Sequence, residues 1–216
     1  MLETTIEHDI RYEGANAVAD FSSLRLTFPF IDLLNDNSTC FKYTSYIYLP
    51  PTIPLATAGA ETYGITVLPA TFDPADAPYA HSSPGGQDYI FSVYPNANAS
   101  QTLGLPPAAS VCFQPTSAAH ALPLAFYRNV TNQPTFGNNT AVCDNLIRFW
   151  NTSVTAGLNE PENVLGVVRL SPPLVGEETV WSGVKGVRAT EAFLKNNDVP
   201  CAMLRGYGGT GEGDSG

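Results

Sequence analysis

Short runs in which aromatic and β-branched residues alternate with polar residues are the feature that most constrains how this chain can fold. The clearest run is KYTSYIYL, residues 42–49, which places Tyr43, Ser45, Ile47 and Leu49 on one side of an extended chain. This period of two is the side-chain period of a β-strand. Further strand-like runs cover residues 24–34, 65–72, 88–94, 121–130, 164–171 and 177–189. The sequence therefore predicts many short strands.

Few segments have helical character. Apolar spacing and flanking residues predict short helices at residues 55–62, 141–150 and 189–197. Residues 1–23 and 73–86 are interpreted as irregular. Many short strands with few short helices favour a mainly β (α+β) fold, in which a curved antiparallel sheet closes into a barrel or cone.

Composition limits the classes of function. The chain has 216 residues, which suits one domain with a substantial core. Its formal net charge is −10, and an acidic surface repels nucleic-acid phosphates and anionic lipids. No apolar run approaches the length of a membrane-spanning helix. We therefore expect neither a nucleic-acid partner nor a membrane partner.

Cysteines and glycosylation sequons favour a secretory location. The four cysteines are widely spaced and form no compact zinc pattern: Cys40, Cys112, Cys143 and Cys201. Their even number predicts two disulfides, with three alternative pairings. N-glycosylation sequons begin at Asn37, Asn98, Asn129, Asn138 and Asn151. These features predict a secreted, disulfide-bonded glycoprotein. The first residues do not form a signal peptide, so we expect a removed leader or a start inside a longer product.

Histidine spacing predicts no metal site. His8, His81 and His120 lie far apart in the sequence, and no pair has the spacing of metal ligands. We expect neither a metal ion nor a cofactor. Residues 207–216 are rich in glycine and are expected to form a disordered tail.

Two longer segments carry a family resemblance. Residues 46–74, YIYLPPTIPLATAGAETYGITVLPATFDP, contain Gly59, Ala60 and Glu61 at the end of the expected helix. Residues 164–189, VLGVVRLSPPLVGEETVWSGVKGVRA, contain the motif VWSG. The first segment resembles acetoacetate decarboxylases, whose short helix ends in Gly-Arg-Glu, and the second is similar to their strand pair with an Ala-Trp-Thr-Gly motif. The resemblance implies a β-barrel or cone with a buried apolar pocket. It implies a single domain, residues 1–206, that lacks the family's N-terminal region.

The resemblance also implies that this chain lacks residues on which the chemistry of the family depends. A 3-oxo acid loses CO2 readily when an unprotonated lysine forms a Schiff base and accepts the electrons. The family's adjacent lysines correspond to Val67 and Leu68, and a pocket glutamate of the family corresponds to Ser23. We therefore expect a small pocket that binds an oxo acid or related carbonyl compound without Schiff-base catalysis, as in a pseudoenzyme.

The three lysines of the chain do not change this expectation. Lys42 and Lys195 are expected at solvated surface positions, and Lys185 is the one that could face inward.

Glu61 is the family carboxylate that remains. In an apolar pocket it could act as an acid or base, whereas near a helix end it could serve structure alone. The expected pocket residues are Ser23, Glu61, Val67, Leu68 and Trp181. Two alternatives stay open: a lyase, either decarboxylase or hydratase, that uses Glu61 in place of lysine, and a non-catalytic extracellular glycoprotein whose pocket is filled. An incomplete barrel would leave an open strand edge that could pair in an oligomer.

Overall fold

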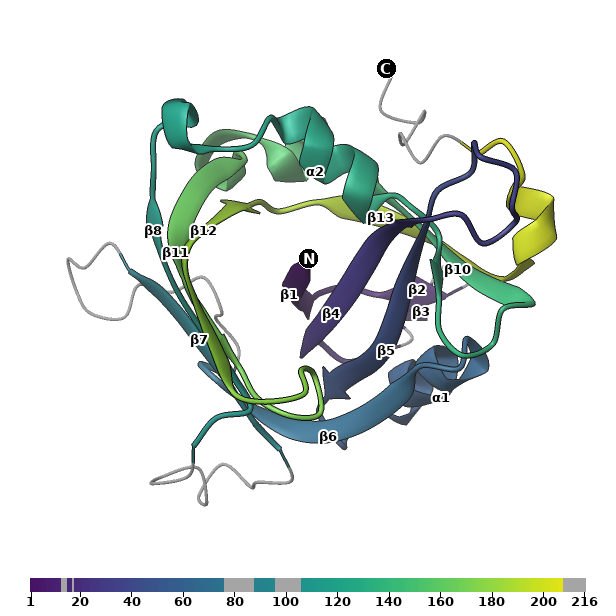
Figure 1. Ribbon diagram of the computed structural model, residues 1–216, viewed down its shortest axis with the longest axis horizontal. Coiled ribbons are helices and arrows are strands. Elements are labelled where there is room, and N and C mark those ends of the chain that lie inside the picture. The colour runs from purple at the N-terminus through teal and green to yellow at the C-terminus, as the bar shows by residue number, and fades with distance from the viewer. Residues whose placement is uncertain (13–14, 17, 76–87, 96–105, 208–216) are drawn as a thin grey trace.

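The protein is mainly β in the computed structural model, which describes residues 1–12, 15–16, 18–75, 88–95 and 106–207 (Figure 1). Within this part of the chain, eleven strands form one mixed sheet and two short strands form a separate hairpin. The predicted mainly β class is confirmed. The predictions for Asn98 and His81 and for the tail at 208–216 lie outside the described residues.

The elements are short and closely spaced. The strands of the large sheet are β1 (Leu2–Glu7), β4 (Phe21–Ile31), β5 (Phe41–Leu49), β6 (Thr66–Asp73), β7 (Tyr89–Pro95), β8 (Ala109–Pro115), β9 (Thr135–Phe136), β10 (Val142–Phe149), β11 (Glu162–Leu170), β12 (Thr179–Arg188) and β13 (Ala192–Pro200). The hairpin consists of β2 (Arg11–Tyr12) and β3 (Ala15–Asn16). The described residues contain two α-helices, α1 (Pro54–Thr62) and α2 (Leu124–Thr131), and the short 3₁₀ helices η2 (Ala118–His120), η3 (Ser153–Thr155), η4 (Gly157–Asn159) and η5 (Cys201–Leu204). Neither α-helix is long and apolar enough to cross a bilayer.

The sheet is curved and mixed rather than wholly antiparallel. Its order is β12-β11-β8-β7-β6-β5-β9-β10-β13, with β4 beside β5 and β1 beside β4. Strand β5 runs parallel to both β6 and β9, which corrects the expected antiparallel sheet. Helix α1 makes the first of these pairings feasible, because parallel neighbours need a crossover connection. Figure 1 shows the strands curving around a common interior, and no described pairing joins the terminal strands β12 and β13.

Strands β4 and β5 separate two cores. Leu24 and Tyr48 belong to an apolar cluster that β6, β7, β8 and β11 complete. Phe21 and Ile47 belong to a second cluster, into which Tyr63 packs after helix α1. Because successive side chains of a strand point to opposite faces, Arg25 lies on the face opposite Leu24. The central strands are thus buried from both sides.

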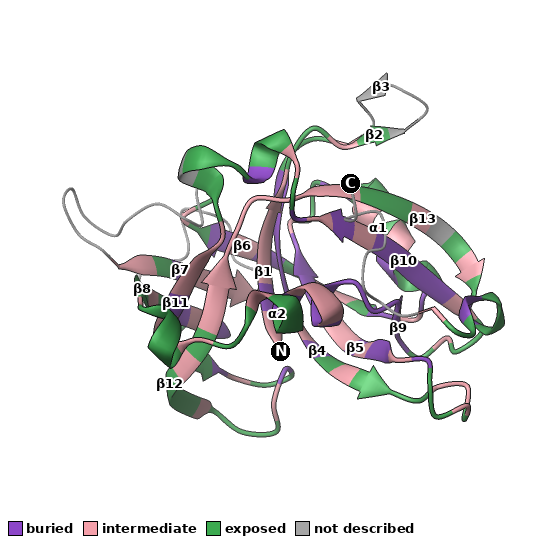
Figure 2. Ribbon diagram, turned by 90° about the horizontal axis from the view of Figure 1, so that it is seen from above, coloured by how far each residue is buried: buried purple, intermediate pink, exposed green. Residues whose placement is uncertain are grey.

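The structure corrects the secondary structure predicted for residues 141–150. This segment is strand β10 and not a helix. Its polar residues Asp144, Asn145 and Arg148 are buried together with its apolar ones, and Figure 2 shows burial along most of the strand. A strand that is covered on both faces does not alternate between apolar and polar residues. The apolar spacing therefore matched a helix by coincidence.

Three further segments differ from the predictions. The run at 121–130 is largely helix α2, whose buried residues Tyr127, Val130 and Thr131 follow helical spacing. The segment at 189–197, expected to be helical, lies mostly in strand β13, which pairs with β10. The N-terminal region, expected to be irregular, contains β1, which pairs with β4 over six residues. Segments 189–197 and 1–7 thus form strands because each pairs with a strand that is distant in the sequence.

One of the two expected disulfides forms. Cys143 and Cys201 are bonded, which ties β10 to η5. Cys40 is half-buried and Cys112 is exposed, and both are free thiols. The expectation of a second disulfide is therefore wrong.

Candidate functional site

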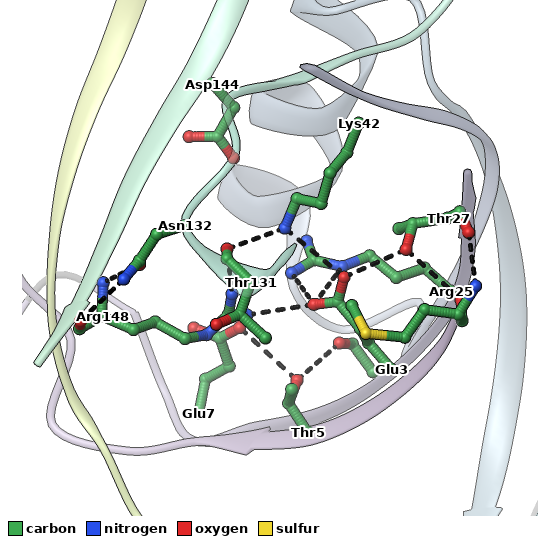
Figure 3. Close-up of polar contacts among 12 residues, drawn as sticks. Glu3, Thr5, Glu7, Arg25, Thr27, Lys42, Thr131, Asn132, Asp144 and Arg148 are labelled. Carbon is green, nitrogen blue, oxygen red and sulfur yellow. Dashed lines mark hydrogen bonds and ion pairs between the residues drawn. The ribbon is translucent and has the colours of Figure 1, made fainter. Parts of the chain in front are cut away.

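Four ionisable side chains from four strands meet in the protein interior. Glu3 comes from β1, Arg25 from β4, Lys42 from β5 and Arg148 from β10, and each is at most 8% exposed. We call these four residues the charge cluster (Figure 3). Such residues are almost never fully buried unless they are paired.

Glu3 is the centre of the charge cluster. Its Oε2 accepts from Arg25 Nη2 at 2.8 Å and from Arg148 Nη2 at 3.2 Å. Its Oε1 lies 3.4 Å from Lys42 Nζ. Burial alone would raise the pKa of Glu3, but Arg25, Lys42 and Arg148 hold that pKa well below its usual value. Glu3 is therefore a carboxylate that balances three buried cations.

Lys42 is buried, although the sequence had suggested a position at the surface. It is 1% exposed, and its Nζ donates to the Thr131 carbonyl oxygen at 2.8 Å, at the end of α2. Burial lowers the pKa of Lys42 from 10.5 to about 7; Glu3 opposes this shift, whereas Arg148 and Arg25 add to it. This amine therefore loses its proton more readily than that of a solvated lysine.

Arg148 is fixed from several directions. Its Nη1 donates to the Thr131 carbonyl oxygen at 3.0 Å, and its Nε lies 3.1 Å from Glu191 Oε2. Its backbone N–H donates to Asn132 Oδ1 at 2.7 Å, and Asn132 Nδ2 donates to the Arg148 carbonyl oxygen. The Arg148 guanidinium is thus held by the last residue of α2 and by Glu191, and its backbone is held by Asn132.

Two buried oxygen atoms near Lys42 have no hydrogen-bond partner among the described residues. They are Thr44 Oγ1, two residues along β5, and Asp144 Oδ1 on β10. Thr44 is 0% exposed and Asp144 is 7% exposed. Buried polar atoms are normally satisfied, so an unsatisfied one needs a physical reason.

The structure brings one expected pocket residue close to the charge cluster. Ser23 is 3% exposed on β4, and its Oγ lies 2.8 Å from Thr5 Oγ1 on β1. It shares a strand face with Arg25. Val67 and Leu68, at the positions of the family lysines, lie elsewhere: Val67 packs against the α1 core, and Leu68 packs on the other side of the sheet.

The other two expected pocket residues are exposed. Glu61 is an exposed residue of α1, where its carbonyl oxygen accepts from the Gly64 N–H at 2.9 Å. Trp181 is 41% exposed on β12. Ser23, Glu61, Val67, Leu68 and Trp181 therefore do not form one pocket.

Two surface depressions lie away from these residues. One, of about 370 Å³, is lined by Ile90, Cys112, Val167 and neighbouring residues of β7, β8, β11 and β12. The other, of about 300 Å³, is lined by residues that include Leu122, Pro123 and Asn163. Neither lining contains an expected pocket residue.

The remaining expected positions are distributed over the surface. Asn37, Asn138 and Asn151 are exposed, whereas Asn129 is half-buried on α2. Lys185 and Lys195 are exposed, so Lys185 does not face inward. The described residues contain no group of three or more His, Cys, Asp or Glu side chains that could hold a metal ion.

Sequence reasoning missed the charge cluster because its members are far apart in the chain. Arg25 and Lys42 each lie in a strand whose polar positions resemble a solvent-exposed face. The sequence offered one signal: alternation shows that a strand has a polar face, but it does not show whether water or a second layer of the protein covers that face. Only the pairing of β1 with β4 and of β10 with β9 and β13 shows that this layer exists.

Comparisons with protein-family models, with curated proteins and with solved structures found no match. What the site can do must therefore be argued from its chemistry. A buried amine with a pKa of about 7 can add to a carbonyl carbon, which an ordinary lysine at neutral pH does rarely.

Proposed function

We propose that this protein is an acetoacetate decarboxylase-like protein that binds a small oxo acid or related carbonyl compound at Lys42. In this proposal the curved sheet corresponds to the cone of that family, and the working amine comes from β5 instead of the positions of Val67 and Leu68. Secretion and glycosylation belong to the same proposal, with which the Cys143–Cys201 disulfide is compatible.

The observation that carries the proposal is the state of the Lys42 amine. It is buried beside two guanidinium groups, and its pKa is lowered to about 7. Desolvation and neighbouring cations are the two means by which a lysine becomes a nucleophile. The expectation that Schiff-base chemistry is absent depended on Val67 and Leu68 at the family lysine positions and on placing Lys42 in solvent. Because Lys42 is buried, we replace that expectation with this proposal.

The chemistry can be written without a cofactor. The unprotonated Lys42 amine adds to the ketone carbon of a 3-oxo acid, one proton is taken up from the solvent, and loss of water gives an iminium ion. The bond to the carboxylate carbon then breaks, CO2 leaves, and the electron pair moves to the nitrogen as an enamine. Protonation of the enamine carbon and hydrolysis return the free amine. Glu61 has no part in these steps, because it is exposed on α1.

One observation favours a second candidate, a non-catalytic extracellular glycoprotein. Glu3 contacts all three cations of the charge cluster, as in a network that serves structure alone. In that case Lys42 is a structural partner of Glu3 and binds no carbonyl compound.

Borohydride trapping tests the proposal. Folded protein is incubated with acetoacetate, reduced with borohydride and analysed by peptide mass spectrometry, while CO2 release is measured in parallel. We expect an adduct on the peptide that contains Lys42, none in Lys42→Met, and an unchanged yield in Lys195→Met, which removes an exposed lysine.

Each result has a distinct meaning. An adduct at Lys42 with CO2 release above the spontaneous rate supports a lyase. An adduct without CO2 release supports carbonyl binding alone. Absence of an adduct from correctly folded protein, across a panel of 3-oxo acids, contradicts the proposal and favours the structural glycoprotein.

A further inference from the structure

Asp144 and Lys42 lie on the two strands that flank β9. Thr135 of β9 pairs with Lys42 of β5 on one side and with Asp144 of β10 on the other. Directly paired residues point to the same face, so Lys42 and Asp144 flank Thr135 on one face. In the view of Figure 3 the Lys42 amine lies between Glu3 and Asp144. The charge of Asp144 also acts on both Lys42 and Arg25.

The two oxygens of Asp144 have different surroundings. Oδ2 lies 3.6 Å from Lys195 Nζ, a long ion pair with a partly exposed side chain. Oδ1 is buried and has no hydrogen-bond partner among the described residues. The carboxylate thus has a long ion pair through one oxygen, while the other oxygen is buried without a hydrogen bond from the described residues.

We infer that Asp144 is the proton-transfer residue of the Lys42 site. This inference rests on the proposed function. When the amine adds to the ketone, its nitrogen becomes a cation and the ketone oxygen becomes an anion. Asp144 Oδ1 accepts a proton from this nitrogen and donates it to the oxygen, which gives a hydroxyl group. The hydroxyl takes up a second proton, from the solvent, and leaves as water while the iminium ion forms.

The charged groups around Lys42 leave this role to Asp144. Arg25 and Arg148 are cations that remain protonated, and the N-terminal amine of Met1, which also interacts with Lys42, donates to the Thr27 carbonyl oxygen at 2.6 Å. Glu3 is engaged by Arg25, Arg148 and Lys42, and its pKa is held well below its usual value, so it is a poor proton acceptor. Asp144 is the neighbouring carboxylate with an oxygen that no described residue engages.

The test is the rate of imine formation, followed by borohydride trapping at timed intervals and at several pH values. Asp144→Asn keeps the shape of the side chain and removes the proton acceptor, and we expect a rate lower by about 100-fold or more. Lys185→Met, which removes an exposed lysine of β12, should leave the rate unchanged. Formate should restore part of the rate to Asp144→Ser, because it supplies a small carboxylate to the space created.

The outcomes separate this inference from the function on which it rests. Wild-type protein that forms no adduct contradicts the proposed function itself. Wild-type protein that forms the adduct, with Asp144→Asn reacting at the same rate and with the same pH profile, overturns the role of Asp144 alone. If Asp144→Asn does not fold, a folded Asp144→Ser whose rate is normal, or low and insensitive to formate, overturns it.

Discussion

At the scale of single residues, Glu3 allows three cations to be buried, because its carboxylate pairs with each of them. Each guanidinium or ammonium group loses hydration when it enters the interior, and Glu3 returns part of that loss through contacts of 2.8 to 3.4 Å. The same carboxylate raises the pKa of Lys42. Glu3 therefore affects both the stability of the cluster and the reactivity of its amine.

Replacing Glu3 tests this dependence. Glu3→Gln keeps the size of the side chain but removes the carboxylate that pairs with Arg25 and Lys42, while Arg148 keeps its ion pair with Glu191. We expect the free energy of unfolding to fall by roughly 3–5 kcal/mol, as measured by urea denaturation. Glu61→Gln, which removes a charge from an exposed position, should change it by about 0.5 kcal/mol or less. A Glu3→Gln protein as stable as the wild type would show that the cations are satisfied without Glu3.

At the scale of elements, β10 links most of the site to the rest of the fold. It supplies Arg148 and Asp144, pairs with β9 and β13, and is bonded through Cys143 to Cys201 of η5. Its buried Arg148 is contacted by Glu3 of β1 and by Thr131 and Asn132 at the end of α2, which no pattern within residues 141–150 could reveal.

The disulfide gives a prediction at this scale. Cys143 and Cys201 are separated by 58 positions, so their bond restricts a long loop in the unfolded chain. Cys143→Ala combined with Cys201→Ala should lower the free energy of unfolding by roughly 2–5 kcal/mol in urea denaturation. Cys112→Ser, at an exposed free thiol, is the matched control and should leave it nearly unchanged. Equal stability of the double variant and the control would contradict a structural role for the bond.

At the scale of the whole molecule, buried ionisable groups make stability depend on pH. The folded pKa of Lys42 is about 7, below the ordinary 10.5. Between these values the unfolded state binds more protons than the folded state, so the free energy of unfolding rises with pH. Glu3 has a lowered pKa, so its contribution is present above about 4.5 and is lost as the pH falls below that value.

Urea denaturation at pH 7, 8 and 9 checks this pH dependence. The wild-type free energy of unfolding should rise relative to that of Lys42→Met, by up to about 1.4 kcal/mol per pH unit. Lys195→Met should follow the wild type, since Lys195 is exposed. Parallel curves for the wild type and Lys42→Met would mean that Lys42 keeps its proton when folded.

The sequence by itself determined the elements whose signals are local. The alternation at residues 42–49 predicted β5, the run LATAGAET followed by Gly64 predicted α1, and ITVLPATF predicted β6. These signals depend on side-chain period and backbone preference within a few residues. The mainly β class followed from them, as did the strand pair β11 and β12.

Only the tertiary structure decided the site and the layers around it. Whether Lys42 meets water or Glu3 depends on β1, β4 and β10, whose residues Glu3, Arg25 and Arg148 are 17 to 106 positions away in the sequence. The same holds for which cysteine meets Cys143, and for whether residues 141–150 are covered on both faces. A local pattern shows the side-chain period of a segment. Whether a charged side chain in that segment is buried depends on which distant segments pack over it.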